Sequence, residues 1–299
     1  MDQLITKLLE PGAGHESAAA RLARHFTASG VGISDIRGEQ LIELYRALGQ
    51  SANAPNWRGT ISKGLQPYPN PDPAGVLGVI VETRQHPALE YVIELFSEYL
   101  EIPIQLLHGA RNEAFIREST ISALVAQGKV VLTGLETDTL TPADYNALLL
   151  SREFWHALAG RGKVLIFQTD SVLCGKSGFQ LEDFVDYDYI GSNWPRRRPI
   201  GLIIDGGSGG LSLRDWGRSV ECLDRFPALH WKGGEDAYFA FHMELIGALV
   251  GKPDACARFS TQSEFLANSF GAHQISLLSE QDQAEFLRYC PEAAVLSDK

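Results

Sequence analysis

Short apolar runs recur along the middle of the sequence, separated by helix-length segments. They cover residues 76–81, 104–107, 129–132 and 164–167. Between the first two runs, apolar residues such as Leu89 and Phe96 are spaced as one face of a helix. Strands joined by helix-length crossovers form parallel βαβ units. The chain is therefore predicted to be an α/β protein with a Rossmann-type, mostly parallel sheet and flanking helices.

Two further helices are expected from local signals. Thr141 and Pro142 mark a helix start before the fourth run, with threonine as the N-cap and proline at the first helical position. A long helix is expected near residues 236–250. The alternation of strands and helices weakens after residue 171, where the sequence becomes richer in glycine. These patterns predict a nucleotide-binding half followed by a less regular acceptor half.

The first 75 residues have a different character. Residues 1–50 show helical periodicity without strand signals, which predicts a helical accessory subdomain. Residues 51–75 contain five prolines and are expected to form an extended linker. Residues 76–299 then make up the main domain.

Composition limits the classes of function. The chain has 299 residues and a formal net charge of −11 without a basic cluster of the size that nucleic acid needs. No apolar stretch approaches the roughly 20 residues that span a bilayer, and the N-terminus lacks a signal-like pattern. We therefore expect a cytoplasmic protein, or one peripheral to the inner face of the membrane. The four cysteines are widely spaced and are expected to be reduced thiols rather than zinc ligands.

Asp170 is the third residue after the apolar run at residues 164–167. Residues just beyond the carboxyl end of such a strand project into the crevice where open α/β sheets bind ligands. Asp170 and the neighbouring Ser171 are thus candidates for a donor or metal site. The alternative is that Asp170 only caps a turn.

Glu235 and Asp236 form an acidic pair at the expected start of a helix, after Gly233 and Gly234. The positive end of a helix dipole keeps such carboxylates ionised. Either acid is a candidate general base for an attacking hydroxyl. The open alternative is that the pair simply caps the helix.

Two more segments are candidate ligand contacts. Glu82, Thr83 and Arg84 end the first apolar run, where a nucleotide would lie. Gly209 and Gly210 belong to a glycine run without a following Gly-Lys-Ser/Thr, so it is not a Walker loop. Their backbone amides are expected to approach a donor sugar or acceptor, although a flexible loop explains glycines equally well.

Trp194 and Arg196 lie in an aromatic and arginine-rich stretch of this acidic chain. Aromatic faces stack on sugar rings, and guanidinium groups bind phosphates. The pair is therefore a candidate contact for an acceptor or a diphosphate. A solvated surface loop is the alternative.

The motifs resemble, in order, those of the GT-A class of nucleotide-sugar glycosyltransferases, and in particular the domain-of-unknown-function 5672 family. The resemblance covers about residues 78–276, or about two thirds of the chain. It is carried by residues 79–87, 107–109, 165–171, 188–194, 209–214, 235–236 and 269–273.

This resemblance implies a GT-A-like fold and transfer of a sugar from a nucleoside-diphosphate sugar to a hydroxyl acceptor, such as a bacterial glycan or surface polysaccharide. It implies that Asp170 and His273 hold Mn²⁺ or Mg²⁺ or contact the diphosphate, and that Asp236 is the base of an inverting reaction. The sequence departs from the family pattern because Asp170 stands alone where the class commonly has Asp-x-Asp.

Two other readings are open at this stage. A sugar-nucleotidyltransferase shares such a core, but the sequence after residue 81 lacks its glycine-rich, basic signature. A glycan-binding module could also retain the fold without catalysis. The donor sugar, its base, the acceptor and the oligomeric state do not follow from the sequence.

Overall fold

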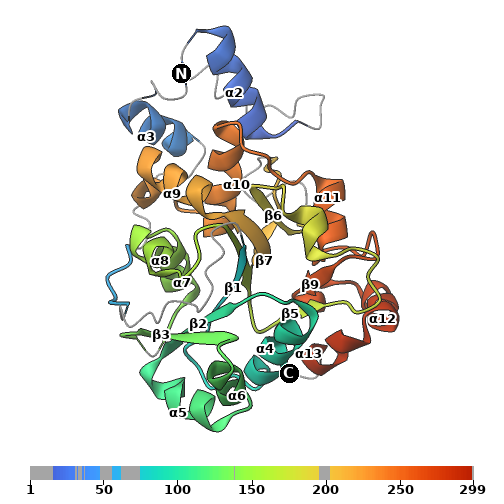
Figure 1. Cartoon of the computed structure of the whole chain (residues 1–299). Helices are drawn as coiled ribbons and strands as arrows, with labels where there is room; N and C mark the ends of the chain where they lie inside the picture. The colour runs from blue at the N-terminus through green and yellow to red at the C-terminus, as the bar shows by residue number, and fades with distance from the viewer. Residues whose placement is uncertain are drawn as a thin grey trace.

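The computed structural model describes residues 16–30, 32, 36, 38–47, 56–61, 75–137, 139–194 and 203–297. Its centre is a six-stranded sheet (Figure 1). In spatial order the strands are β3 (Val130–Leu135), β2 (Ile104–Gly109), β1 (Val76–Val81), β4 (Lys163–Phe167), β7 (Ser208–Asp215) and β6 (Tyr189–Ser192). The pairs β3–β2, β2–β1 and β1–β4 are parallel, whereas β7 is antiparallel to both β4 and β6.

Helices cover both faces of this sheet, which confirms the predicted mixed α/β architecture with a mostly parallel sheet. Alternate residues of one strand pack into opposite core clusters, as Val79 and Ile80 do. The helices after the N-terminal region are α4 (Leu89–Tyr99), α5 (Ala110–Glu118), α6 (Ile121–Ala126), α7 (Pro142–Leu149), α8 (Arg152–Ala157), α9 (Trp216–Arg225), α10 (Glu235–Leu245), α11 (Pro253–Phe259), α12 (Glu280–Tyr289) and α13 (Ala294–Ser297).

The structure confirms the predicted helix start at Thr141 and Pro142, but the helix predicted near residues 236–250 ends earlier than expected. Thr141 caps α7 with its side chain accepting from the Asp144 N–H, and Pro142 is the first helical residue. Helix α10 ends at Leu245 rather than near residue 250. Gly247, just beyond this end, has φ +80°, a conformation that stops a helix and favours glycine.

The N-terminal helices α2 (Ala18–Ala28) and α3 (Gly38–Ala47) lie beside α9 and α10 (Figure 1). Leu22 and Leu44 are buried in the same core cluster as one face of the sheet. The Ser17 hydroxyl donates to a Glu244 carboxylate oxygen at 2.6 Å, which ties α2 to α10. The described part of residues 1–50, predicted as a helical accessory subdomain, therefore packs into the same core cluster as the sheet.

A buried histidine joins these helices to α10. The Tyr45 hydroxyl donates to Nε2 of His242 at 2.5 Å, and Nδ1–H of His242 donates to the Tyr238 carbonyl at 2.7 Å. Burial lowers the pKa of His242 to about 3, although the hydrogen bond to Tyr238 acts in the opposite direction. This imidazole is therefore neutral at pH 7.

Part of the expected linker also packs on the sheet. Ile61 forms an antiparallel bridge with Leu135, and the Thr60 carbonyl accepts from the Glu136 N–H at 2.9 Å. Residues 56–61 thus extend along the end of β3. The other residues assigned to the linker, 51–55 and 62–74, lie outside the described residues, and residue 75 leads into β1.

A second, three-stranded sheet was not foreseen. Its order is β5 (Ser171–Leu173), β9 (Gly271–His273) and β8 (Ser260–Thr261). Strand β5 begins four residues after β4 ends, so this small sheet continues the chain away from the main one. Its pairing brings the C-terminal part of the chain back to the end of β4.

Two expectations about chemistry and environment can be compared with the described residues. All four cysteines are buried and free in the structure. None of the described helices is long and apolar enough to cross a membrane.

Candidate active site

A cavity of about 550 Å³ opens where β1 and β4 end and β7 begins. These three strand ends lie at one edge of the sheet because β7 runs antiparallel to its neighbour. The cavity wall includes most of the candidates from the sequence: Glu82, Thr83, Arg84, Asp170, Gly209, Gly210, Glu235, Asp236 and His273. Sequence positions almost 200 residues apart are thus brought to one place.

Asp170 and His273 face each other across the two sheets. Ser171 pairs with His273 in the antiparallel register of β5 and β9, so His273 lies beside the residue that follows Asp170. Nε2 of His273 is 3.2 Å from Oδ1 of Asp170 and 3.1 Å from Oε1 of Gln168. Burial raises the pKa of Asp170, but the hydrogen bond and charge of His273 outweigh this and lower it overall.

The donor set of Asp170 and His273 fits two positions of a cation site. Mg²⁺ is octahedral with bonds of about 2.0–2.1 Å, so adjacent ligand atoms are about 3 Å apart. The separation of 3.2 Å between Oδ1 of Asp170 and Nε2 of His273 agrees with that spacing. No cluster of three or more His, Cys, Asp or Glu residues that could hold a metal occurs in the described chain. A cation here would need oxygens from water or from the substrate.

Ser171 does not line the cavity, which corrects the expectation that it contacts the donor. Its hydroxyl donates to the Gly210 carbonyl at 2.9 Å and accepts from the Gln168 N–H at 3.0 Å. The side chain is fully buried. Ser171 therefore fixes the turn that carries Asp170.

Glu82 and Arg84 form a bidentate ion pair at the end of β1. Nε and one terminal nitrogen of Arg84 donate to the two carboxylate oxygens of Glu82 at 2.9 and 2.7 Å. Glu82 is buried, whereas the Arg84 side chain is 65% exposed. The Asn112 amide holds this turn by donating to the Glu82 carbonyl at 2.7 Å. The guanidinium is thus kept at the edge of the cavity with its charge already balanced.

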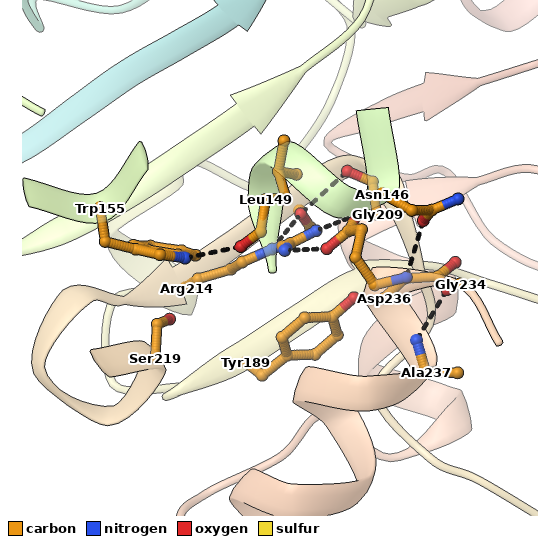
Figure 2. A network of polar contacts seen from close by, with 12 residues as sticks. Asn146, Leu149, Trp155, Tyr189, Gly209, Arg214, Ser219, Gly234, Asp236 and Ala237 are labelled. Atoms are coloured by element: carbon orange, nitrogen blue, oxygen red, sulfur yellow. Dashed lines mark hydrogen bonds and ion pairs between the residues drawn. The ribbon is translucent and has the colours of Figure 1, made fainter. Parts of the chain in front are cut away.

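Glu235 is paired with Arg214, a fully buried arginine on β7 (Figure 2). One terminal nitrogen of Arg214 donates to Oε1 of Glu235 at 3.0 Å, and the other donates to Oε2. Burial lowers the pKa of Arg214, but the negative charge of Glu235 outweighs this and raises it. Both oxygens of Glu235 are therefore occupied, which argues against the expected role of Glu235 as a proton acceptor.

Asp236 lies one residue further along, in the first turn of α10. The N-cap of this helix is Gly234, and the Ala237 N–H in its first turn donates to Oδ1 of Asp236 at 2.6 Å (Figure 2). The Asn146 side chain from α7 accepts from the Glu235 N–H at 2.8 Å. The half-buried Asp236 carboxylate lines the cavity close to the positive end of the helix dipole. Asp236 is the more exposed of the two acids in the cavity wall.

The glycines of β7 make room for side chains of the protein itself. A Cβ on Gly210 would lie 2.1 Å from the His273 ring, and one on Gly209 would lie 2.4 Å from Oε1 of Glu235. Both glycines do line the cavity. Their small size is nevertheless explained by His273 and Glu235, without the ligand approach that the sequence suggested.

Trp194 does not reach this cavity and lines a separate hollow. Arg196 lies outside the described residues. Several cavity residues were missed by sequence reasoning, among them Tyr145, Asn146, Ser208, Gln262 and Gln274. Asn146 and Tyr145 sit on α7, whose start was predicted, but no signal showed which face of that helix meets the cavity.

Comparisons with known proteins give a family match over part of the chain and no activity. Residues 132–274 match the family described as "Protein of unknown function (DUF5672)", which confirms the family resemblance over that segment. The match is shorter than the expected 78–276 and leaves out Glu82 and Arg84. A search of curated proteins finds no match.

One solved structure with a similar chain is a "putative glucose-1-phosphate thymidylyltransferase" from Bacillus anthracis in complex with sucrose. It has 11% sequence identity and a TM-score of 0.37, and the alignment covers 60% of this chain and 86% of that one. This likeness is too low to support a specific fold family or a shared activity.

Proposed function

We propose that this protein is a glycosyltransferase that moves a sugar from a nucleoside-diphosphate sugar to the hydroxyl group of an acceptor. The observation that carries the proposal is that candidate residues from distant parts of the sequence lie in one cavity. Asp170, Asp236 and His273, singled out by the sequence for this reaction, line one cavity at the sheet edge where α/β proteins bind nucleotides.

The charge of the cavity favours a divalent cation as part of the reaction. Four carboxylates line it, those of Glu82, Asp170, Glu235 and Asp236, against the single guanidinium of Arg84. Even with Arg214 and a protonated His273 included, four negative charges face three positive ones. A diphosphate would enter such a cavity poorly without a cation.

Asp170 and His273 are the residues that would hold Mn²⁺ or Mg²⁺. When bound, the cation would neutralise the charge that develops on the leaving nucleoside diphosphate. The nearby His273 side chain lowers the pKa of Asp170 and so favours the carboxylate form that a cation needs. Glu82, Thr83 and Arg84 would then border the nucleotide.

Asp236 would be the general base of an inverting reaction. The acceptor oxygen attacks the anomeric carbon of the donor sugar while Asp236 takes the proton of that hydroxyl. The bond from the anomeric carbon to the diphosphate breaks, and its electrons leave with the diphosphate. The paired Glu235 serves a different purpose, since its contact with Arg214 holds the first turn of α10 in place.

The cavity gives less support to the two alternatives. A nucleotidyltransferase must bind a triphosphate, yet the described lining of this cavity contains no lysine, and its one arginine is paired with Glu82. A glycan-binding module needs no cation and no base. It therefore makes the opposite prediction for nucleotide and metal binding.

The test is a thermal-shift panel of UDP, GDP, CDP and dTDP sugars with and without Mn²⁺ or Mg²⁺. A ligand at 100 times its dissociation constant adds about 2.7 kcal/mol of stability. We expect one nucleotide-sugar class to stabilise the protein only with a cation, followed by slow release of the nucleoside diphosphate. Stabilisation by nucleoside triphosphates alone would favour nucleotidyl transfer, and no response to any nucleotide would refute both enzyme proposals.

A further inference from the structure

Trp194 lines a hollow of about 250 Å³ that is separate from the cavity. The indole is fixed because its Nε1–H donates to the Ile204 carbonyl at 3.1 Å. Asp205, Gly206 and Gly207 form another side of the hollow, and Ser263 and Glu264 a third. The proposed donor and cation sites lie in the cavity and do not include this hollow.

The hollow adjoins the cavity at the same edge of the main sheet. Strand β6 ends at Ser192, two residues before Trp194, and β7 begins at Ser208. Gly207 lines the hollow, whereas the next residue, Ser208, lines the cavity. Successive Cα atoms are only about 3.8 Å apart, so the two spaces meet at this point.

A second backbone segment also runs from the wall of the cavity to the wall of the hollow. Gln262 lines the cavity and the following Ser263 lines the hollow. Asn193 holds this segment, because its Oδ1 accepts from the Gln262 N–H at 2.6 Å and from the Ser263 N–H at 3.2 Å. Two backbone segments therefore border both spaces, and their mutual position is fixed.

Buried polar atoms without hydrogen-bond partners lie on both sides of this boundary. They are Oγ of Ser208 and Oε1 of Gln262 on the cavity side and Oδ1 of Asp205 on the hollow side. Each residue is less than 9% exposed. Leaving such atoms unpaired is unfavourable, and a ligand with suitably placed hydroxyl groups would supply the missing hydrogen bonds.

The chemistry of the hollow selects the ligand. Its described lining contains the carboxylates of Asp205 and Glu264 and no lysine or arginine. Lys252, outside the lining, pairs with Oδ2 of Asp205 at 3.0 Å, so Oδ1 is the oxygen of Asp205 that a ligand can reach. A lining without its own cationic side chain disfavours a phosphate or nucleotide. An aromatic side chain beside hydrogen-bond acceptors suits a neutral ring with an apolar face and hydroxyl donors. Such a ring is a sugar.

We propose that the Trp194 hollow binds the second sugar ring of a glycan acceptor. The first ring then lies in the cavity, with its reacting hydroxyl near Asp236. Ser208 and Gln262 receive hydroxyl groups at the junction, and Asp205 receives one from the second ring. This inference rests on the proposed glycosyl transfer and specifies its acceptor as an oligosaccharide.

The experiment measures oligosaccharide binding and donor binding separately. The intact protein is applied to a printed array of defined mono- to pentasaccharides, and its strongest disaccharide and the matching monosaccharide are then titrated by calorimetry. The variants are Trp194→Leu, which keeps an apolar side chain, and Asp205→Asn, which keeps the shape. The matched control is Asp186→Asn, at an exposed carboxylate outside both spaces.

We expect Trp194→Leu to weaken disaccharide binding about tenfold, near the upper end of what one aromatic pair contributes. Asp205→Asn should weaken it about fivefold, because a neutral amide oxygen accepts a weaker hydrogen bond than a carboxylate. Monosaccharide binding and the thermal shift with nucleotide sugars and Mn²⁺ should be unchanged, as should every property of the control. Equal disaccharide affinity in the parent and both variants would overturn the inference, as would a folded parent that retains no oligosaccharide. A parent that binds disaccharides through Trp194 but no nucleotide sugar would instead refute the proposed glycosyl transfer alone.

Discussion

Arg214 and Glu235 form an ion pair that is sealed between β7 and the start of α10. The Arg214 side chain has no exposed surface, and that of Glu235 is 4% exposed. Tyr189 and Phe239 flank the guanidinium, whose carbon lies 5.2 and 5.4 Å from their ring centroids. The pair thus anchors the turn on which Asp236 sits.

Glu235→Gln should destabilise the protein by about 3–5 kcal/mol, because it leaves Arg214 charged and buried without its counter-ion. Urea denaturation followed by circular dichroism measures this change. The double variant Arg214→Met with Glu235→Leu removes both charges and should be more stable than Glu235→Gln alone. If Glu235→Gln unfolds at the parental urea concentration, the pair does not anchor this turn.

Asp236→Asn should retain donor binding while turnover falls by about 10²- to 10⁴-fold, the range for loss of a general base. The amide has the size of the carboxylate but accepts no proton at neutral pH. Because Gly234 is the N-cap, the substitution should cost little stability. Nucleoside-diphosphate release in the presence of acceptor gives the rate, and a near-parental rate would show that another group takes the proton.

Asp170→Ala should abolish cation-dependent binding of the nucleotide sugar and leave the fold intact, since the side chain is 43% exposed and faces the cavity. Titration calorimetry with Mn²⁺ and the donor identified by thermal shift tests this. Asp186→Ala, at an exposed carboxylate away from the cavity, is the control. Parental affinity in Asp170→Ala would mean that the cation is held elsewhere.

Gly210→Ala should weaken cation and donor binding at least tenfold, because the added Cβ would lie 2.1 Å from the His273 ring and displace it. The matched control is Gly178→Ala, where a Cβ meets no atom within 4 Å. Calorimetric titration of both variants with Mn²⁺ and donor separates them. Equal affinities would show that the position of His273 is not important for the site.

His242→Gln should make stability less sensitive to acid. The folded-state pKa of His242 is about 3, below the ordinary value of 6.5, so between these pH values the unfolded chain binds a proton that the folded chain does not. The contribution is complete above pH 6.5 and falls by about 1.4 kcal/mol per pH unit as the solution is acidified.

Urea denaturation between pH 4.5 and 6.5 gives this slope, which should decrease by about that amount in His242→Gln. Tyr45→Phe is the companion variant, since it removes the hydroxyl that donates to Nε2 but keeps the imidazole buried. It should lower stability by about 1–3 kcal/mol at each pH and leave the slope unchanged. An unchanged slope in His242→Gln would contradict a neutral buried imidazole.

The strands of the main sheet were predictable where apolar residues run continuously, as at residues 164–167 in β4. Such runs are the local signature of strands buried on both faces. The strands of the small sheet are only two or three residues long, and β5 pairs with β9 across about 100 residues of sequence. No local pattern marks such pairings, so the contact of His273 with Asp170 was expected from family resemblance alone.

Arg214 shows a different limit. Its position in an apolar strand indicates burial, and a buried arginine requires a partner, but the sequence does not say which carboxylate provides it. In the structure Glu235 is the partner of Arg214, whereas the Asp236 carboxylate lines the cavity. Which of the two acids reaches Arg214 depends on the orientation of the first turn of α10. The packing of Tyr45 on His242 was equally invisible, because it depends on how α3 docks against α10.

The order of strands also indicates how much of the chain is needed to complete the main sheet. The family match starts within β3, includes β4 and omits β1 and β2. Strand β4 is central because β1 pairs with it on one side and β7 on the other. A polypeptide limited to residues 132–274 would leave one side of β4 as an open, apolar edge, a template for aggregation. The segment that matches the family is therefore shorter than the sheet that supports it, and the candidate site residues within it depend on strands that lie outside it.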